Sequence, residues 1–127
     1  MFSPKTLCTR ILAPVLFLFV LLSGVVQAND KVYQQAWNHI ADGALIVDVR
    51  TPAEFAQGHL PGAINIPLPQ VVEEFAARNI GKDTDVMLYC RSGNRSGQAQ
   101  KALIAEGYTN TFNGLGYQGL MAHKPQQ

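Results

Sequence analysis

The fold of this 127-residue chain is decided by the stretch Val86-Met87-Leu88-Tyr89-Cys90-Arg91-Ser92-Gly93-Asn94-Arg95-Ser96. Its first four residues are an apolar run bounded by polar residues, which is typical of a strand buried on both faces of a sheet. The turn that follows contains Gly93 and Asn94, the two residue types that most readily adopt left-handed backbone angles. Residues 96–106 then have a helical pattern that a glycine ends. We predict a strand, a polar turn and a helix, with Cys90 directly after the strand.

Helix and strand patterns alternate on both sides of this stretch. Upstream, Asp30 is the predicted cap of a short helix that extends to about residue 40, and Thr51-Pro52-Ala53-Glu54 is a capping box that starts a helix ending at Gly58. Further elements are predicted as strands at 44–49, 63–67 and 111–112 and as a helix at 71–80. Such alternation predicts a single α/β domain with a mostly parallel central sheet flanked by helices. Ligands of such sheets bind beyond the carboxyl ends of the strands, where Cys90 is expected.

The first 28 residues have the pattern of an export signal. Lys5 and Arg10 are their only charged residues, residues 11–22 are strongly apolar, and Val26-Gln27-Ala28 offers small or modest side chains to a signal peptidase. An uncleaved membrane anchor is the alternative, but the apolar run contains Pro14 and is shorter than the roughly 20 residues that span a bilayer. We therefore predict cleavage after Ala28, no stable membrane anchor, and a domain of residues 29–127 exported to a periplasm.

Cleavage changes how the cysteines and the charges are interpreted. It removes Cys8, so Cys90 is left as a single thiol in a compartment where disulfides are normal. The alternative is that Cys90 is a small buried apolar residue. Cleavage also changes the formal net charge from +1 to −1, because two basic residues leave with the signal. A nearly neutral domain without a basic arm is not expected to bind nucleic acid.

The loop from Cys90 to Ser96 has the composition of an anion-binding turn. Its glycine and asparagine allow successive amides to point inward, and the helix that begins near Ser96 contributes partial positive charge. Arg91 and Arg95 add two full charges, and the combined field favours the thiolate form of Cys90. We predict a nucleophilic thiolate that faces an anion pocket; the alternative is a solvated turn whose arginines point into water.

Other polar residues are predicted to have structural roles. His59 lies between glycine and proline residues and is expected to shape the turn rather than act as a base. Arg50 is expected to form an ion pair with a neighbouring carboxylate, Asp48 or Glu54, although these three side chains could also line the mouth of the site. His39 is predicted to lie at the surface or to pack. No group of His, Cys and Asp has the spacing of metal ligands, so we expect no metal.

Three segments together resemble the rhodanese family of single-domain sulfurtransferases. Residues 90–95 resemble the six-residue active-site loop of that family, which begins with a cysteine at a strand end. The segment Gly58-His59-Leu60-Pro61-Gly62-Ala63-Ile64-Asn65-Ile66-Pro67 resembles a second hallmark, and Asp48-Val49-Arg50 followed by Glu54-Phe55 a third. The chain departs from the family near its end, where the usual glycine pair appears as Gly114-Leu115-Gly116-Tyr117 and Leu120 replaces a common tryptophan.

This resemblance implies a thiosulfate sulfurtransferase without a cofactor. The Cys90 thiolate would take the outer sulfur of thiosulfate, release sulfite and pass the sulfur to cyanide or a thiol. Arg91 and Arg95 would bind the dianion, and the amides from Ser92 to Ser96 would hold the persulfide or the sulfite. A rhodanese-like phosphatase or arsenate reductase is one alternative, although its loop has one more residue; a noncatalytic persulfide carrier or binding module is another. We expect a monomer or a weak dimer.

Overall fold

The computed structural model describes residues 28–126. The chain divides into two units, Met1–Lys31 and Val32–Gln127. Residues 28–31 of the first unit are helical, and the predicted export signal otherwise lies outside the described residues. Within residues 28–126, no helix has both the length and the apolar character needed to cross a membrane. The architecture below is that of the second unit.

The second unit contains a four-stranded parallel sheet. Its strands are β1 (Leu45–Asp48), β2 (Ile64–Asn65), β3 (Val86–Cys90) and β4 (Thr111–Gly116), and they lie in the order β2-β1-β3-β4. Strand β1 pairs in parallel with β2 and β3, and β3 also pairs in parallel with β4. This arrangement confirms the predicted α/β fold with a parallel central sheet.

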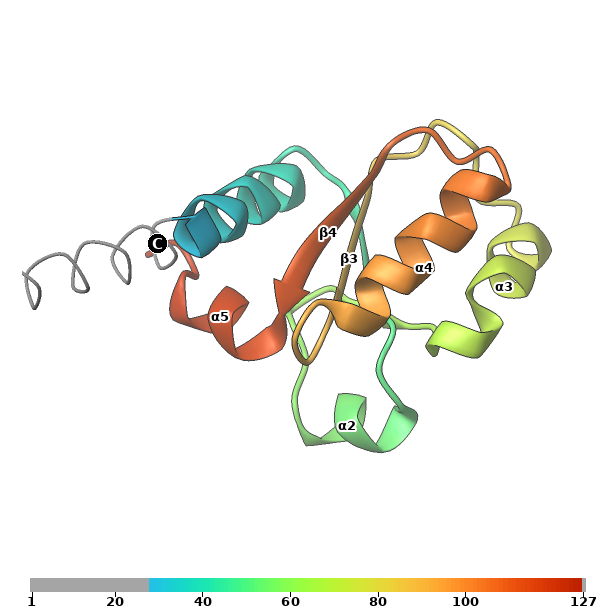
Figure 1. Cartoon of the computed structure of the whole chain (residues 1–127). Helices are drawn as coiled ribbons and strands as arrows, with labels where there is room; N and C mark the ends of the chain where they lie inside the picture. The colour runs from blue at the N-terminus through green and yellow to red at the C-terminus, as the bar shows by residue number, and fades with distance from the viewer. Residues whose placement is uncertain (1–27, 127) are drawn as a thin grey trace, which may run out of the picture. The chain divides into compact units, whose positions relative to one another are not determined.

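Helices cover both faces of this sheet. The helix of residues 32–41 and α5 (Tyr117–Ala122) lie on one side of β3 and β4, and α3 (Val71–Ala77) and α4 (Asn94–Ala105) lie on the other (Figure 1). The short helix α2 (Pro52–Gln57) and the 3-10 helix η1 (Leu68–Gln70) connect the strands. Parallel strands require crossover connections, and the helices on the two faces supply the apolar side chains that cover the sheet.

Strand β3 lies at the centre of the hydrophobic core. All five of its residues are buried, as expected for a strand with helices on both faces. Val86, Leu88 and Cys90 contribute to the cluster beneath α3 and α4, and Met87 and Tyr89 contribute to the cluster on the opposite face. This alternation places the Cys90 side chain on the α4 side of the sheet.

The capping box of α2 forms as predicted. The Glu54 amide donates to Thr51 Oγ1 at 3.2 Å, and the Thr51 amide donates to Glu54 Oε1 at the same distance. Pro52 occupies the start of the helix and Gly58 its C-cap, with a φ of 150° that favours glycine.

Several predicted element boundaries differ from the structure. Cys90, predicted directly after the strand, is the last residue of β3, and α3 ends at Ala77 instead of residue 80. Residues 28–30 are already helical, so Asp30 does not cap the start of the first helix. Helix α4 begins at Asn94 instead of Ser96, so Gly93 alone in the turn has a left-handed conformation, with a φ of 98°. Strand β4 extends beyond Phe112 to Gly116 and leads directly into α5, which had no predicted counterpart.

The glycines of β4 explain why its sequence resembles a loop. A Cβ at Gly114 would collide with the Met87 side chain, and one at Gly116 would collide with the carbonyl group of Arg91. The strand therefore uses glycine where it lies closest to β3 and to the segment that follows it. A glycine-rich composition here reflects close packing, which local propensity does not reveal.

Candidate active site

Cys90 ends β3, and the loop that follows curls around its sulfur. The Gly93 amide donates to Cys90 Sγ at 3.0 Å, and the Ser96 hydroxyl lies 3.4 Å from the same atom. The residue is 1% exposed and is the free cysteine of the described chain. The structure thus brings together the predicted nucleophile, the left-handed glycine and the first turn of α4.

The environment of Cys90 favours its thiolate. Burial by itself raises the pKa of the thiol. Hydrogen bonds from the Ser96 hydroxyl and from the amides of Ser96, Ser92 and Gly93 outweigh burial, so the pKa of Cys90 lies below its usual value. The main stabilising groups are therefore the hydrogen-bond donors of the loop, whereas the sequence also predicts a contribution from the arginines.

Arg95 forms a two-pronged ion pair across the site. Its Nη1 and Nη2 atoms donate to the two carboxylate oxygens of Glu54 on α2, at 2.7 and 2.9 Å. These hydrogen bonds lower the pKa of Glu54 to about 2. The sequence indicated two arginines available to an anion, but the structure shows that the charge of Arg95 is already matched by a carboxylate.

Arg50 forms the predicted ion pair with a neighbouring carboxylate. Its Nη2 atom lies 2.6 Å from an oxygen of Asp48, which is completely buried, and it also donates to the Gly58 carbonyl at 2.7 Å. The guanidinium lies 4.7 Å from the centre of the Tyr117 ring. Arg50 therefore joins the end of β1 to the end of α2 and to the start of α5.

Arg91 differs from these two arginines. Its side chain is exposed, and it takes part in none of the ion pairs found within residues 28–126. It borders a cleft of about 420 Å³ that adjoins the loop. The other residues that line this cleft come from β1, α2 and α5 and their flanks; they are Arg50, Glu54, Gln57, Gly58, Tyr117 and Gln118. Arg91 is thus the guanidinium best placed to meet an anion there.

His59 has the structural environment that the sequence predicts. Its Nδ1 atom lies 2.8 Å from the Phe55 carbonyl oxygen, and its ring stacks on the Phe55 ring with centroids 3.6 Å apart. These contacts tie the turn after α2 to the helix itself. They support a role for His59 in shaping the turn.

Asn113, which contacts the loop from β4, is a residue of the site that the sequence does not predict. Its Nδ2 donates to the Gly93 carbonyl at 3.0 Å, and its Oδ1 accepts from the Ser96 hydroxyl at 2.7 Å and from the Leu115 amide at 3.0 Å. The one local signal was an asparagine beside a glycine near the end of a predicted strand. This pair of residues is more common in turns. Only strand pairing brings Asn113 next to the loop.

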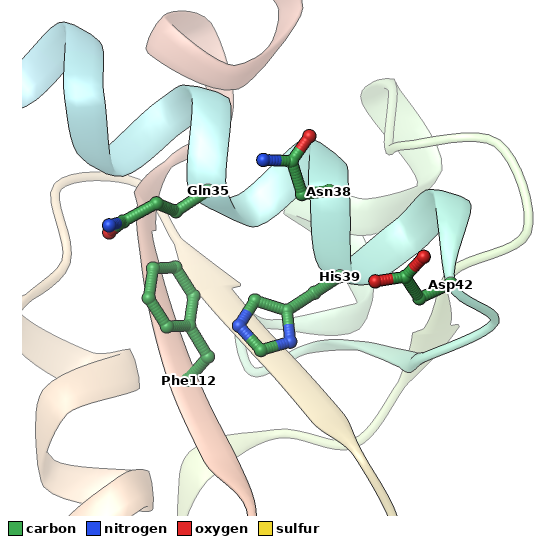
Figure 2. Close-up of a pocket in the computed structure, with 5 residues that line it drawn as sticks. All are labelled: Gln35, Asn38, His39, Asp42 and Phe112. Atoms are coloured by element: carbon green, nitrogen blue, oxygen red, sulfur yellow. The ribbon is translucent and has the colours of Figure 1, made fainter.

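A second hollow, of about 270 Å³, lies elsewhere on the domain (Figure 2). Figure 2 shows the His39 ring beside the Phe112 ring, with Gln35, Asn38 and Asp42 around them. His39 Nδ1 lies 2.9 Å from an Asp85 carboxylate oxygen, and Asp85 immediately precedes β3. This hollow therefore belongs to the amino end of β3, opposite to Cys90, and its lining contains no nucleophilic thiol. His39 packs as predicted.

No group of three or more His, Cys, Asp or Glu side chains within residues 28–126 could hold a metal ion. The candidate site consists instead of one thiol, the hydrogen-bond donors around it, and a cleft with one unpaired guanidinium. That combination can stabilise a sulfur anion and receive a small anionic substrate.

Comparison with known proteins agrees with this geometry. Residues 32–118 match the model of the rhodanese-like domain. The thiosulfate sulfurtransferase PspE of Escherichia coli is 41% identical over 78 residues, which cover 61% of this chain and 75% of PspE. A sulfurtransferase of Allochromatium vinosum is 44% identical over 72 residues, 57% of this chain and 65% of that protein. The thiosulfate:glutathione sulfurtransferase of Saccharomyces cerevisiae is 36% identical over 78 residues, 53% of this chain and 56% of that protein.

A solved structure shows the same similarity in three dimensions. A rhodanese with anions from E. coli superposes with a TM-score of 0.58 and 40% identity, covering 61% of this chain and 91% of that one. The fold, the cysteine-containing loop and the family match lead to one conclusion: the chain belongs to the rhodanese-like domain family.

Proposed function

We propose that the protein is a thiosulfate sulfurtransferase in which Cys90 is the nucleophile. The observation that carries the proposal is the position of the Cys90 sulfur at the end of β3, 3.0 Å from the Gly93 amide, with a lowered thiol pKa. A thiolate, rather than a thiol, is the nucleophilic form. The names of the E. coli and yeast relatives support thiosulfate as the sulfur donor.

In the first half-reaction, the Cys90 thiolate attacks the outer sulfur of thiosulfate. A bond forms between the two sulfurs while the S–S bond of thiosulfate breaks, and sulfite leaves with the electron pair. Sulfite is a good leaving group and needs no proton at this step. Arg91 binds the oxygens of the anion, and the loop amides from Ser92 to Ser96 stabilise the persulfide.

Asn94 and Arg95 support this step from the first turn of α4. Both belong to the first turn of the helix, from which the Ser96 amide donates to the sulfur, and the Glu54 pair offsets the charge of Arg95. We therefore assign the stronger contribution to thiosulfate affinity to Arg91.

In the second half-reaction, cyanide or the thiolate of an acceptor attacks the terminal sulfur of the persulfide. The electron pair returns to the Cys90 sulfur, which regenerates the thiolate without a cofactor. The yeast relative is named for glutathione, which supports a small thiol as acceptor. The cleft beside Arg91 is wide enough for such a molecule, since small-molecule sites begin at about 300 Å³.

We further propose that residues 1–28 direct export and are removed, which leaves residues 29–127 in the periplasm as a monomer or weak dimer. The charged residues and the apolar run of the first 28 residues support this proposal. N-terminal sequencing of the protein from a periplasmic extract should begin at Asn29, and a precursor confined to the membrane would contradict it. Analytical centrifugation of the purified protein would test its oligomeric state.

A single-turnover experiment tests the enzymatic proposal. Mixing the purified protein with thiosulfate should release one equivalent of sulfite and add the mass of one sulfur atom to Cys90. The Cys90→Ser variant should do neither, and Arg91→Ala should require more thiosulfate for the same rate. A wild-type protein that shows neither product would refute the proposal. Cys90-dependent hydrolysis of a phosphate monoester in the same preparation would favour the phosphatase alternative.

A further inference from the structure

Asn113 contacts two of the three residues that donate hydrogen bonds to the Cys90 sulfur. The Gly93 amide donates to Cys90 Sγ at 3.0 Å, and the Ser96 hydroxyl lies 3.4 Å from the same atom. Asn113 binds the carbonyl of the first residue and the hydroxyl of the second, at 3.0 and 2.7 Å. One side chain on β4 thus holds two separate parts of the loop.

The Ser96 hydroxyl can make only one of its two possible hydrogen bonds at a time. A serine hydroxyl carries a single hydrogen, and here it lies 2.7 Å from Asn113 Oδ1 and 3.4 Å from Cys90 Sγ. The shorter contact indicates that the hydrogen points to Asn113 when the sulfur is neutral. A charged acceptor forms a stronger hydrogen bond, so a thiolate or persulfide competes for the same hydrogen. Asn113 therefore sets the starting position of this donor.

An irregularity in β4 brings Asn113 to this position. The strand pairing passes from Leu88 opposite Asn113 to Cys90 opposite Gly116, so β4 uses one more residue than β3 over the same distance. The extra residue creates a bulge, and Leu115 has a left-handed φ of 67°. Asn113 Oδ1 accepts the Leu115 amide and so stabilises the bulge.

The bulge also packs directly against the loop. An ideal Cβ on Gly93 would lie 2.9 Å from Leu115 Cδ2 and 3.1 Å from Leu115 Cα, so only glycine fits there without movement. The loop and the bulge are thus matched in shape, and Asn113 is the side chain that bonds to both.

We propose that Asn113 is a positioning residue for the Cys90 sulfur: it holds the Gly93 amide on the sulfur and competes with the sulfur for the Ser96 hydroxyl. Its effect on turnover rests on the proposed sulfurtransferase function. Its effect on thiol reactivity does not, which separates the two proposals experimentally.

The test measures the rate at which iodoacetamide alkylates Cys90 as a function of pH. Four proteins form a double-mutant cycle: the wild type, Asn113→Ala, Ser96→Ala and the double variant. In the Ser96→Ala background, Asn113→Ala should raise the midpoint of the alkylation profile by about half to one pH unit, because the Gly93 amide is no longer held. In the wild-type background the rise should be smaller, because the freed Ser96 hydroxyl turns to the thiolate and compensates.

A matched control separates this effect from a general loss of contact between α4 and β4. Gln100 also joins these elements, since its Nε2 donates to the Thr111 carbonyl at 3.0 Å, but it lies at the other end of β4. The Gln100→Ala variant should leave the alkylation midpoint and sulfite release unchanged, whereas Asn113→Ala should slow sulfite release several-fold.

A second substitution covers the case in which Asn113→Ala does not fold. Serine at position 113 can still accept the Leu115 amide and maintain the bulge, but it is too short to bind Gly93 and Ser96 together. The cycle is then built with Asn113→Ser. Three results would overturn the proposal: the alkylation midpoint shifts equally in both backgrounds, shifts more in the wild-type background, or shifts in neither. If the alkylation midpoints shift as expected but the wild type releases no sulfite, only the proposed function is refuted.

Discussion

The ion pair between Glu54 and Arg95 gives a quantitative prediction about stability. Glutamine in place of Glu54 keeps an oxygen that can accept from Thr51 in the capping box but removes the charge that pairs with Arg95. The two charged groups are joined by hydrogen bonds of 2.7 and 2.9 Å, and their side chains are 32% and 29% exposed. The substitution therefore tests the charge pairing more than the helix cap.

The magnitude follows from the pKa of Glu54, which falls from 4.5 to about 2 in the folded protein. A shift of that size corresponds to about 3.4 kcal/mol at ~1.36 kcal/mol per pH unit. Because almost a third of each side chain is exposed, water screens the interaction, and we expect about 1–2 kcal/mol to be measured.

The sign of the pH dependence is determined by the lowered pKa. Above pH 4.5 the carboxylate is charged in both states and the folded protein has the full stabilisation. As the pH falls toward 2, the folded protein must also take up the proton and the stabilisation is lost. The difference in unfolding free energy between the wild type and Glu54→Gln should therefore decrease over this range.

Urea unfolding from pH 7 to pH 2.5, followed by tryptophan fluorescence, measures this difference directly. The Glu74–Arg78 pair is a suitable control, because it is also an ion pair but its side chains are 38% and 45% exposed. Arg78→Gln should cost less than about 0.5 kcal/mol at any pH. A difference for Glu54→Gln that stays constant between pH 6 and pH 2.5, or that equals the Arg78→Gln effect, would refute the reasoning.

Three further predictions concern the core of the site. Gly116→Ala should destabilise the protein by about 1–3 kcal/mol in urea unfolding and slow sulfite release, because the new methyl group collides with the Arg91 carbonyl; unchanged values for both would contradict the packing described. Arg50→Met should cost about 3–5 kcal/mol, because it leaves the buried Asp48 carboxylate without its partner, and a loss below 1 kcal/mol would be inconsistent with that pair. Alkylation of Cys90 should have its midpoint below that of free cysteine, since its pKa is lowered; a midpoint at or above the free value would contradict the hydrogen-bond geometry.

Most of the fold could be predicted because it rests on local patterns. The buried run at β3, the capping box at Thr51 and the stop at Gly58 each depend on residues that are neighbours in the sequence. The sequence predicted only the start of β4 and nothing of α5. These elements depend on residues that are far apart in the sequence. The glycines of β4 are required by contacts with Met87 and the Arg91 carbonyl, which lie more than 20 residues away in the chain.

The sequence alone pointed to Cys90 as the candidate nucleophile and to the type of loop that holds it, because a cysteine between an apolar strand and a turn with glycine already has a defined position in a parallel sheet. Only the tertiary structure decided how the charges around it are distributed. Glu54 reaches Arg95 from 41 residues away, and Asn113 reaches the loop from another strand. Charged and polar side chains interact through distance and orientation in space, and these depend on packing between elements that no local pattern specifies.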